Sequence, residues 1–300
     1  MKLGGQDVKK LGKRVWADIV ADRVLGRSAE LAYYFLLALF PLLLFLTSLI
    51  GIVMGSGTGL RHSLFNYLSA VLPGSAYQLV DSTMFDVSAS SGGGKVGFGI
   101  LAALWAASSG MGALGDALNA AYKVEESRPW WKQRLMALML TVVLGVLIIS
   151  ALVLVLYGGK IAAWLAASYG FDGIFTTGWA VLQWPLVLVF LLLGFALIYY
   201  WGPDLKDQDW KWVTPGSVVA VALWLLISFA FRLYLHFFDS YSATYGSLGA
   251  VIVLMLWFYL TGAAILVGGE INSDLEDEAA GQGDPDAKKT GEKAPAHESG

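Results

Sequence analysis

The sequence predicts an all-α, polytopic membrane protein with six transmembrane helices. Six apolar runs contain no Lys, Arg, Asp, Glu or His, and each has about 19 to 25 residues, which lets a helix cross about 30 Å of hydrocarbon. Hydrophobic residues make up 57% of the chain and charged residues 14%, whereas about a quarter of a soluble domain is charged. The runs are 31–54, 96–115, 135–157, 178–201, 213–231 and 245–269.

The positive charges predict the orientation of these spans. Segments 1–30, 119–134 and 202–212 together hold 13 Lys and Arg residues, whereas segments 55–95, 158–177 and 232–244 hold 4. Cytoplasmic loops of membrane proteins carry the excess of Lys and Arg. We therefore expect the N-terminus and the C-terminus to be cytoplasmic.

Residues 1–30 are expected to form a cytoplasmic segment with an amphipathic helix on the membrane surface, over about 8–27. Leu11, Val15 and Ile19 recur at four-residue steps, while Lys13 and Arg14 lie on another face, as in interfacial helices. The transmembrane domain follows over 31–271. Its predicted spans are about 31–54, 96–118, 135–157, 178–201, 213–235 and 245–270.

Two further segments lie outside the spans. Residues 55–95 are expected to form an outer loop with short helices: Leu60, Leu64 and Leu68 predict one before Pro73, and residues 75–85 could form another. We expect this loop to cap or gate the outer end of the bundle. Residues 272–300 are rich in Asp, Glu, Gly, Pro and Lys. A segment of this composition buries too little apolar surface to order itself, which predicts a disordered cytoplasmic tail.

Ionisable and amide side chains are confined to the two ends of the predicted bundle. Polar residues inside membrane domains mark candidate functional sites. Four residues, Glu30, Asp116, Asn119 and Glu270, form a candidate inner polar ring or gate at the cytoplasmic end. At the outer end, Arg232, His236 and Asp239 form a candidate polar cluster. An ion pair of Glu270 with Arg128 or Arg134, and snorkelling of Arg232 to the interface, explain the same residues without a function.

The centre of the bundle contains backbone irregularities and small residues in place of charges. Pro41 removes a hydrogen bond near the middle of the first span and is expected to kink it. Ser108 and Gly112 stand four residues apart in the second span. These three residues are a candidate path or hinge. Close helix packing is the more common explanation for small residues at this spacing.

Several segments resemble the YihY/virulence factor BrkB family over about residues 15–272. They are 32–41 (AYYFLLALFP), 117–122 (ALNAAY) followed by Arg128, 245–250 (YGSLGA), 256–259 (LWFY) and 268–272 (GGEIN). The resemblance implies a multi-pass protein of the bacterial cytoplasmic (inner) membrane that exports a small solute or moves a lipid-like substrate. It also makes Tyr34, Pro41, Asn119, Tyr122, Tyr245, Gly246, Gly249 and Glu270 candidates for a shared structural or mechanistic role.

Some members of this family have carried the label ribonuclease BN, but this sequence disfavours an enzyme. A metal-dependent nuclease needs clustered His and carboxylate ligands, whereas His62, His236 and His297 fall in separate parts of the predicted topology. The chain has no cysteine and no phosphate-binding loop of the Walker type. We expect no catalytic residue, no cofactor, no metal and no nucleic-acid partner.

A gated helix bundle that transports a small solute or a lipid-like molecule is the function that the sequence predicts. The alternative is a non-transporting membrane scaffold that supports envelope integrity. The expected partners are membrane lipids and the unidentified substrate, and the topology is compatible with a homo-oligomer.

Overall fold

The chain folds into a bundle of long helices. A computed structural model describes residues 2–3, 6–54, 93–169, 173–206, 212–237, 240–284 and 287–293. The α-helices within these residues are α1 (Val8–Ala21), α2 (Val24–Met54), α5 (Gly93–Ala121), α6 (Trp130–Tyr169), α7 (Gly173–Trp201), α8 (Pro215–Phe237) and α9 (Ser240–Gly281). A short 3-10 helix, η1, covers Thr290–Glu292, and the two-residue strands β1 (Lys2–Leu3) and β2 (Gln6–Asp7) pair antiparallel. The all-α prediction is thus confirmed apart from this small N-terminal strand pair.

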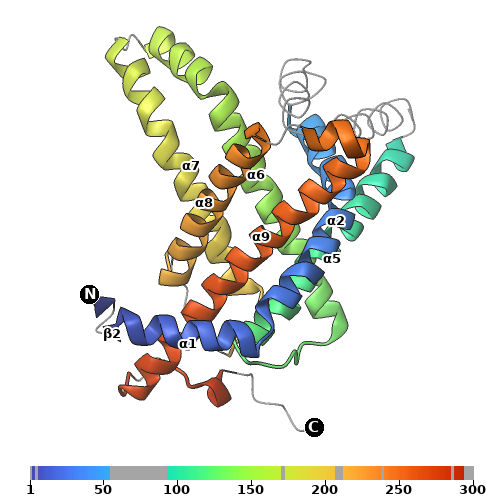
Figure 1. Ribbon diagram of the computed structural model, residues 1–300. Coiled ribbons are helices and arrows are strands. Elements are labelled where there is room, and N and C mark those ends of the chain that lie inside the picture. The colour runs from blue at the N-terminus through green and yellow to red at the C-terminus, as the bar shows by residue number, and fades with distance from the viewer. Residues whose placement is uncertain are drawn as a thin grey trace.

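The long helices form one bundle, and α1 crosses one end of it (Figure 1). Helix α9 packs against α2 and α8, α2 also packs against α5, and α6 packs against both α5 and α7. The N-terminus, α1 and η1 all lie at the same end, which we call the α1 end. The largest buried apolar cluster joins six helices there and includes Leu31, Leu118, Met136, Tyr199, Val221 and Leu266.

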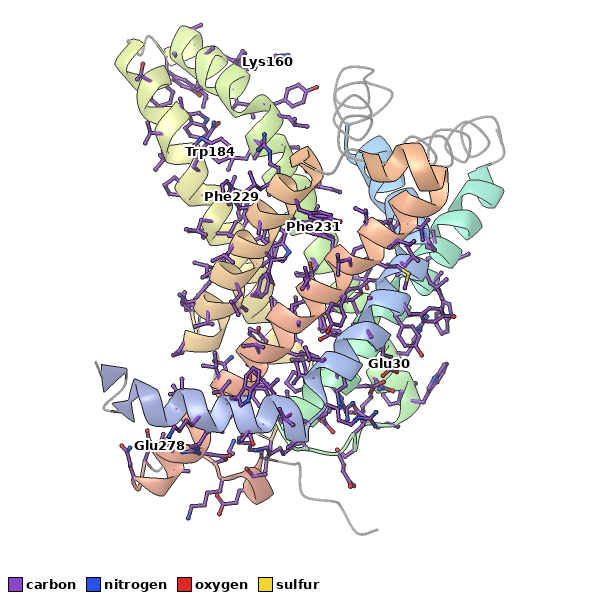
Figure 2. The ribbon with its side chains drawn as sticks, in the orientation of Figure 1. Glu30, Lys160, Trp184, Phe229, Phe231 and Glu278 are labelled. Carbon is purple, nitrogen blue, oxygen red and sulfur yellow. The ribbon has the colours of Figure 1, made fainter. Side chains whose placement is uncertain are left out.

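The composition and surface of the helices make this a multi-pass membrane protein. Five of the six longest described helices contain a whole predicted apolar run, and α8 contains the sixth run except for its first two residues. Within the described residues, four stretches are long and apolar enough to cross a membrane, namely Trp130–Tyr169, Thr177–Trp201, Pro215–Tyr234 and Val251–Gly281. Large apolar side chains point outward from them: Trp184 is 60% exposed and Phe229 is 70% exposed (Figure 2). Hydrocarbon is the medium in which such a surface is stable.

Two predicted segments differ from the structure or lie outside it. The predicted helix over 8–27 is interrupted: α1 ends at Ala21, Arg23 adopts a left-handed conformation with φ of 54°, and α2 begins at Val24. The left-handed residue lets the chain turn from α1 into α2. The prediction of short helices in the outer loop 55–95 falls almost wholly on residues 55–92, which lie outside the described residues.

The predicted disordered tail, 272–300, differs from the structure in its first part. Helix α9 continues to Gly281, and residues 287–293 return to pack against it. Lys293 is 1% exposed, donates hydrogen bonds to the carbonyl and hydroxyl oxygens of Ser273, and lies 3.0 Å from Asp277. The composition of the segment indicated disorder, because composition does not register pairings between residues that are distant in sequence.

The buried Lys293 side chain gives a first testable prediction. Lys293→Ala leaves Ser273 and Asp277 without their cation, so segment 287–293 should detach and protease cleavage just after α9 should become at least tenfold faster. Limited proteolysis of the detergent-solubilised protein measures this rate. Lys289→Ala is the matched control, because Lys289 is exposed; equal cleavage rates in the two variants would contradict the packing described above.

A capping box and a neighbouring helix fix the start of α8. The Thr214 amide donates to the Ser217 hydroxyl at 3.0 Å, and the Ser217 amide donates to the Thr214 hydroxyl at 3.1 Å. Asn272 of α9 accepts a hydrogen bond from the Gly216 amide at 2.8 Å. Amides in the first turn of a helix have no partner within that helix. The α1 end of α8 is therefore held directly by α9.

Candidate functional site

A cleft opens at the α1 end between α2, α5 and α6. Its volume is about 250 Å³, which corresponds to roughly eight water molecules at about 30 Å³ each. Glu30 and Asp116, two of the predicted ring residues, lie in its wall together with Gly112. The lining residues are Arg27, Glu30, Leu31, Tyr34, Ser109, Gly112, Ala113, Asp116, Ala117, Trp130, Gln133, Arg134 and Ala137.

The cleft contains two cationic and two anionic side chains that do not neutralise one another. Arg27 donates to the backbone carbonyl of Asp22 at 3.1 Å, and Asp116 accepts from the Gln133 amide at 2.7 Å. The Arg134 guanidinium lies 4.0 Å from the centre of the Trp105 ring and donates to the Trp105 carbonyl. Among the described residues, no ion pair joins Arg27 or Arg134 to Glu30 or Asp116. The carboxylates of Glu30 and Asp116 are exposed to solvent.

The three residues of the candidate path or hinge have different environments. A Cβ atom built on Gly112 would meet no atom within 4 Å, so this glycine adds free space to the cleft. Ser108 is fully buried and donates to the Trp105 carbonyl of its own helix at 2.7 Å. Pro41 lies within α2, which continues on both sides of it. Of the three, only Gly112 lines the cleft.

Asn119 lies in a buried polar network rather than in the cleft. Its amide group donates to Glu126 at 2.8 Å, and its carbonyl oxygen accepts from the Asp204 amide at 2.7 Å. Arg128 binds both carboxylate oxygens of Glu126, at 2.6 and 2.7 Å, and the Gly202 carbonyl at 3.0 Å. The network connects the end of α5, the segment before α6 and the end of α7.

The electrostatics of this network favour ionised side chains. Burial raises the pKa of Glu126, but the hydrogen bonds from Arg128 and Asn119 together lower it by more. The pKa of Glu126 therefore lies below its ordinary value. Asp204 accepts two hydrogen bonds from Ser127, at 2.8 and 2.5 Å, and lies 3.6 Å from Arg128. Sequence reasoning missed Glu126 and Asp204. The position of Glu126, two residues before Arg128 in the same loop, was the available signal.

Glu270 lies apart from both the cleft and this network. It is fully buried, and neither of its carboxylate oxygens has a hydrogen-bond partner among the described residues. Its charged neighbours are Asp18, Asp22, Lys123 and Asp274. The pairing of Glu270 with Arg128 or Arg134 is therefore wrong, because both arginines bind other groups.

The predicted inner ring is thus divided among three places: Glu30 and Asp116 in the cleft, Asn119 in the network, and Glu270 in a separate acidic cluster. Of the predicted outer cluster, Arg232 is exposed on α8. The side chain of His236 and the whole of Asp239 lie outside the described residues, so the outer polar cluster stays a prediction.

In the described part of the chain, no group of three or more His, Cys, Asp or Glu side chains could hold a metal ion. In the acidic cluster around Glu270, Arg14 lies 3.8 Å from Asp274 and Lys123 lies 3.0 Å from Asp18.

The fold and the polar groups at its end define a polytopic α-helical membrane protein with a charged cleft. The family model for virulence factor BrkB matches residues 15–293. This chain belongs to the virulence factor BrkB family, as the motifs in its sequence indicated.

Curated relatives agree with this assignment. The chain is 40% identical over 250 residues to the putative ribonuclease-like protein YfkH of Bacillus subtilis, and the match covers 83% of this chain and 89% of YfkH. It is 28% identical to a UPF0761 membrane protein of Idiomarina loihiensis, covering 58% of this chain and 59% of the relative. A UPF0761 membrane protein of Stenotrophomonas maltophilia is 23% identical, with 88% of this chain and 60% of the relative covered. No solved structure matches the chain.

Proposed function

We propose that this protein is a transporter of the bacterial cytoplasmic membrane, in which α2, α5, α6, α7, α8 and α9 form six spans and both termini are cytoplasmic. The bias of Lys and Arg toward the predicted inner segments supports this orientation. Lys160, predicted to be outside, and Glu30, predicted to be inside, lie at opposite ends of the bundle (Figure 2).

The cleft between α2, α5 and α6 is the observation that carries the proposal. A packed scaffold has no need for an open hollow lined by four charged side chains. A transporter needs such a hollow as the entry for a polar solute. Transport would alternate access between the two ends, with Pro41 and Gly112 as points of flexibility.

The charges of the cleft favour a small zwitterionic solute. Arg27 and Arg134 suit an anionic group such as a carboxylate, whereas Glu30 and Asp116 suit a cationic group. The Tyr34 and Trp130 rings also line the cleft, and aromatic faces attract ammonium groups. A volume of about 250 Å³ fits a molecule of amino-acid size and is too small for a whole phospholipid.

Proteoliposome flux tests this proposal. Glycine betaine, a chloride salt and a fluorescent phospholipid serve as probes for a zwitterion, an anion and a lipid. We expect uptake of the zwitterion at a rate at least tenfold above empty liposomes. Movement of the lipid without uptake of the zwitterion would show that the substrate is a lipid and would contradict the proposed zwitterionic solute. No movement of any probe would favour the scaffold.

Filling the cleft should abolish this flux. Gly112→Leu places a side chain in the open space of the cleft, so uptake should fall at least tenfold while the folded protein persists. Gly159→Leu is the matched control, since a Cβ on Gly159 of α6 also meets nothing within 4 Å and Gly159 does not line the cleft. Equal flux in the two variants would contradict a path through the cleft.

A further inference from the structure

Glu270 is a fully buried carboxyl group without a partner, in a cluster that already contains more carboxylates than cations. Both of its oxygens lack a hydrogen bond among the described residues. An isolated buried carboxylate is so costly that such a group usually takes up a proton instead. The charged and titratable side chains that face it are Asp18 of α1, Asp22 of the α1–α2 turn, Tyr122 and Lys123 after α5, and Asp274 one turn further along α9.

The nearby cations are committed to other carboxylates. Lys123 lies 3.0 Å from Asp18. Arg14 lies 2.8 Å from Glu278 and 3.8 Å from Asp274. Among the described residues, no ion pair therefore balances an ionised Glu270 in this conformation.

Lys123 has a left-handed backbone conformation, which is strained for a residue other than glycine. Lys123 has a φ of 57°, and hydrogen bonds from Lys123 to Ala120 and from Val124 to Asn119 close a Schellman turn at the end of α5. Glycine is the usual residue at this left-handed position. The lysine instead brings its ammonium group to Asp18, which ties the turn to α1 over the buried glutamate.

We propose that Glu270 is a proton-binding site, neutral while α1 covers it and ionised only when α1 and the turn at Lys123 move away. Binding a proton then stabilises the closed α1 end, and losing it favours an open one. The proposal concerns the proton alone and holds whether or not a solute crosses the bundle.

A hydrophobic carbodiimide tests the protonation state directly, because it modifies protonated carboxyl groups in apolar surroundings. In the full-length protein in detergent, we expect modification of Glu270 at neutral pH, with a several-fold decline as the pH rises, and none at this position in Glu270→Gln. Exposed Glu125 should stay unmodified at neutral pH. Modification of Glu270 confined to acid, as for an ordinary glutamic acid, would overturn the proposal.

The pH dependence of Tm supplies a second readout that does not depend on reagent access. The unfolded chain ionises Glu270 above about pH 4.3, whereas the folded protein keeps the proton. Folded protein therefore binds more protons than unfolded protein, and stability falls as the pH rises. Glu270→Gln mimics the neutral acid and lacks this loss, so its Tm should exceed that of the parent by a margin that widens from about pH 5 upward. A constant or reversed margin would overturn the proposal.

Discussion

Arg128→Ala should lower the free energy of unfolding by about 3 kcal/mol, the lower end of the range for removing one partner of a buried ion pair. The Arg128 side chain is only 18% exposed. Its loss removes both hydrogen bonds to Glu126 and leaves the Gly202 carbonyl without its donor. The end of α7 would then separate from the segment that precedes α6.

Thermal or denaturant unfolding in detergent measures this loss. Lys132→Ala is the control, because Lys132 is exposed in the next turn of the chain and surface substitutions usually stay within about 0.5 kcal/mol. Arg128→Lys should recover only part of the stability, since an ammonium group cannot bind both oxygens of Glu126 as the guanidinium does. Equal stabilities of Arg128→Ala and Lys132→Ala would show that the network is not structural.

Gly268→Ala should destabilise the protein by about 3 kcal/mol, at the upper end of the cost of overpacking. A Cβ at this position would collide with the Tyr199 hydroxyl and lie 2.7 Å from the Gly216 carbonyl oxygen and 2.8 Å from the Ala220 Cβ. Tyr199 is 1% exposed and donates to the Ile265 carbonyl at 2.7 Å. It has little freedom to move, so α8 and α9 must separate.

Gly112→Ala is the matched control for this substitution. Both glycines lie in helices, but the Cβ at Gly112 enters open space. The alanine should leave stability unchanged or raise it by up to about 1 kcal/mol through helix propensity. If Gly112→Ala lowered the free energy of unfolding as much as Gly268→Ala, separation of α8 and α9 would not explain the destabilisation by Gly268→Ala.

The sequence predicted the helices well because their signal is local. A charge-free run of about 20 residues needs no knowledge of its neighbours to be recognised as a membrane helix. The same reasoning placed Glu30, Asp116 and Glu270 at one end of the bundle, and they lie there. Which of these side chains meet depends on the rotation of each helix about its axis. Close approaches between helices, such as that of Gly262 to Leu31, determine this rotation.

The polar network and the docked tail could not be predicted from local pattern for a related reason. Glu126 stands two residues from Arg128, but Asp204 is an ordinary loop residue until the end of α7 brings it to Arg128. Lys293 belongs to a segment whose composition indicates disorder, yet its ammonium group reaches Ser273 of α9. Both features depend on pairings between residues that are distant along the chain, Asp204 with Arg128 and Lys293 with Ser273.

Thiol accessibility tests the central claim, a water-filled path that begins at the cleft, most directly. The chain contains no cysteine, so Gly112→Cys and Ser108→Cys each carry a single thiol for a membrane-impermeant maleimide. We expect Gly112→Cys to react when the reagent reaches the cytoplasmic side of oriented vesicles, and the buried Ser108→Cys to react at least tenfold more slowly. Protection of Gly112→Cys from both sides of the membrane would contradict the path and favour a packed scaffold.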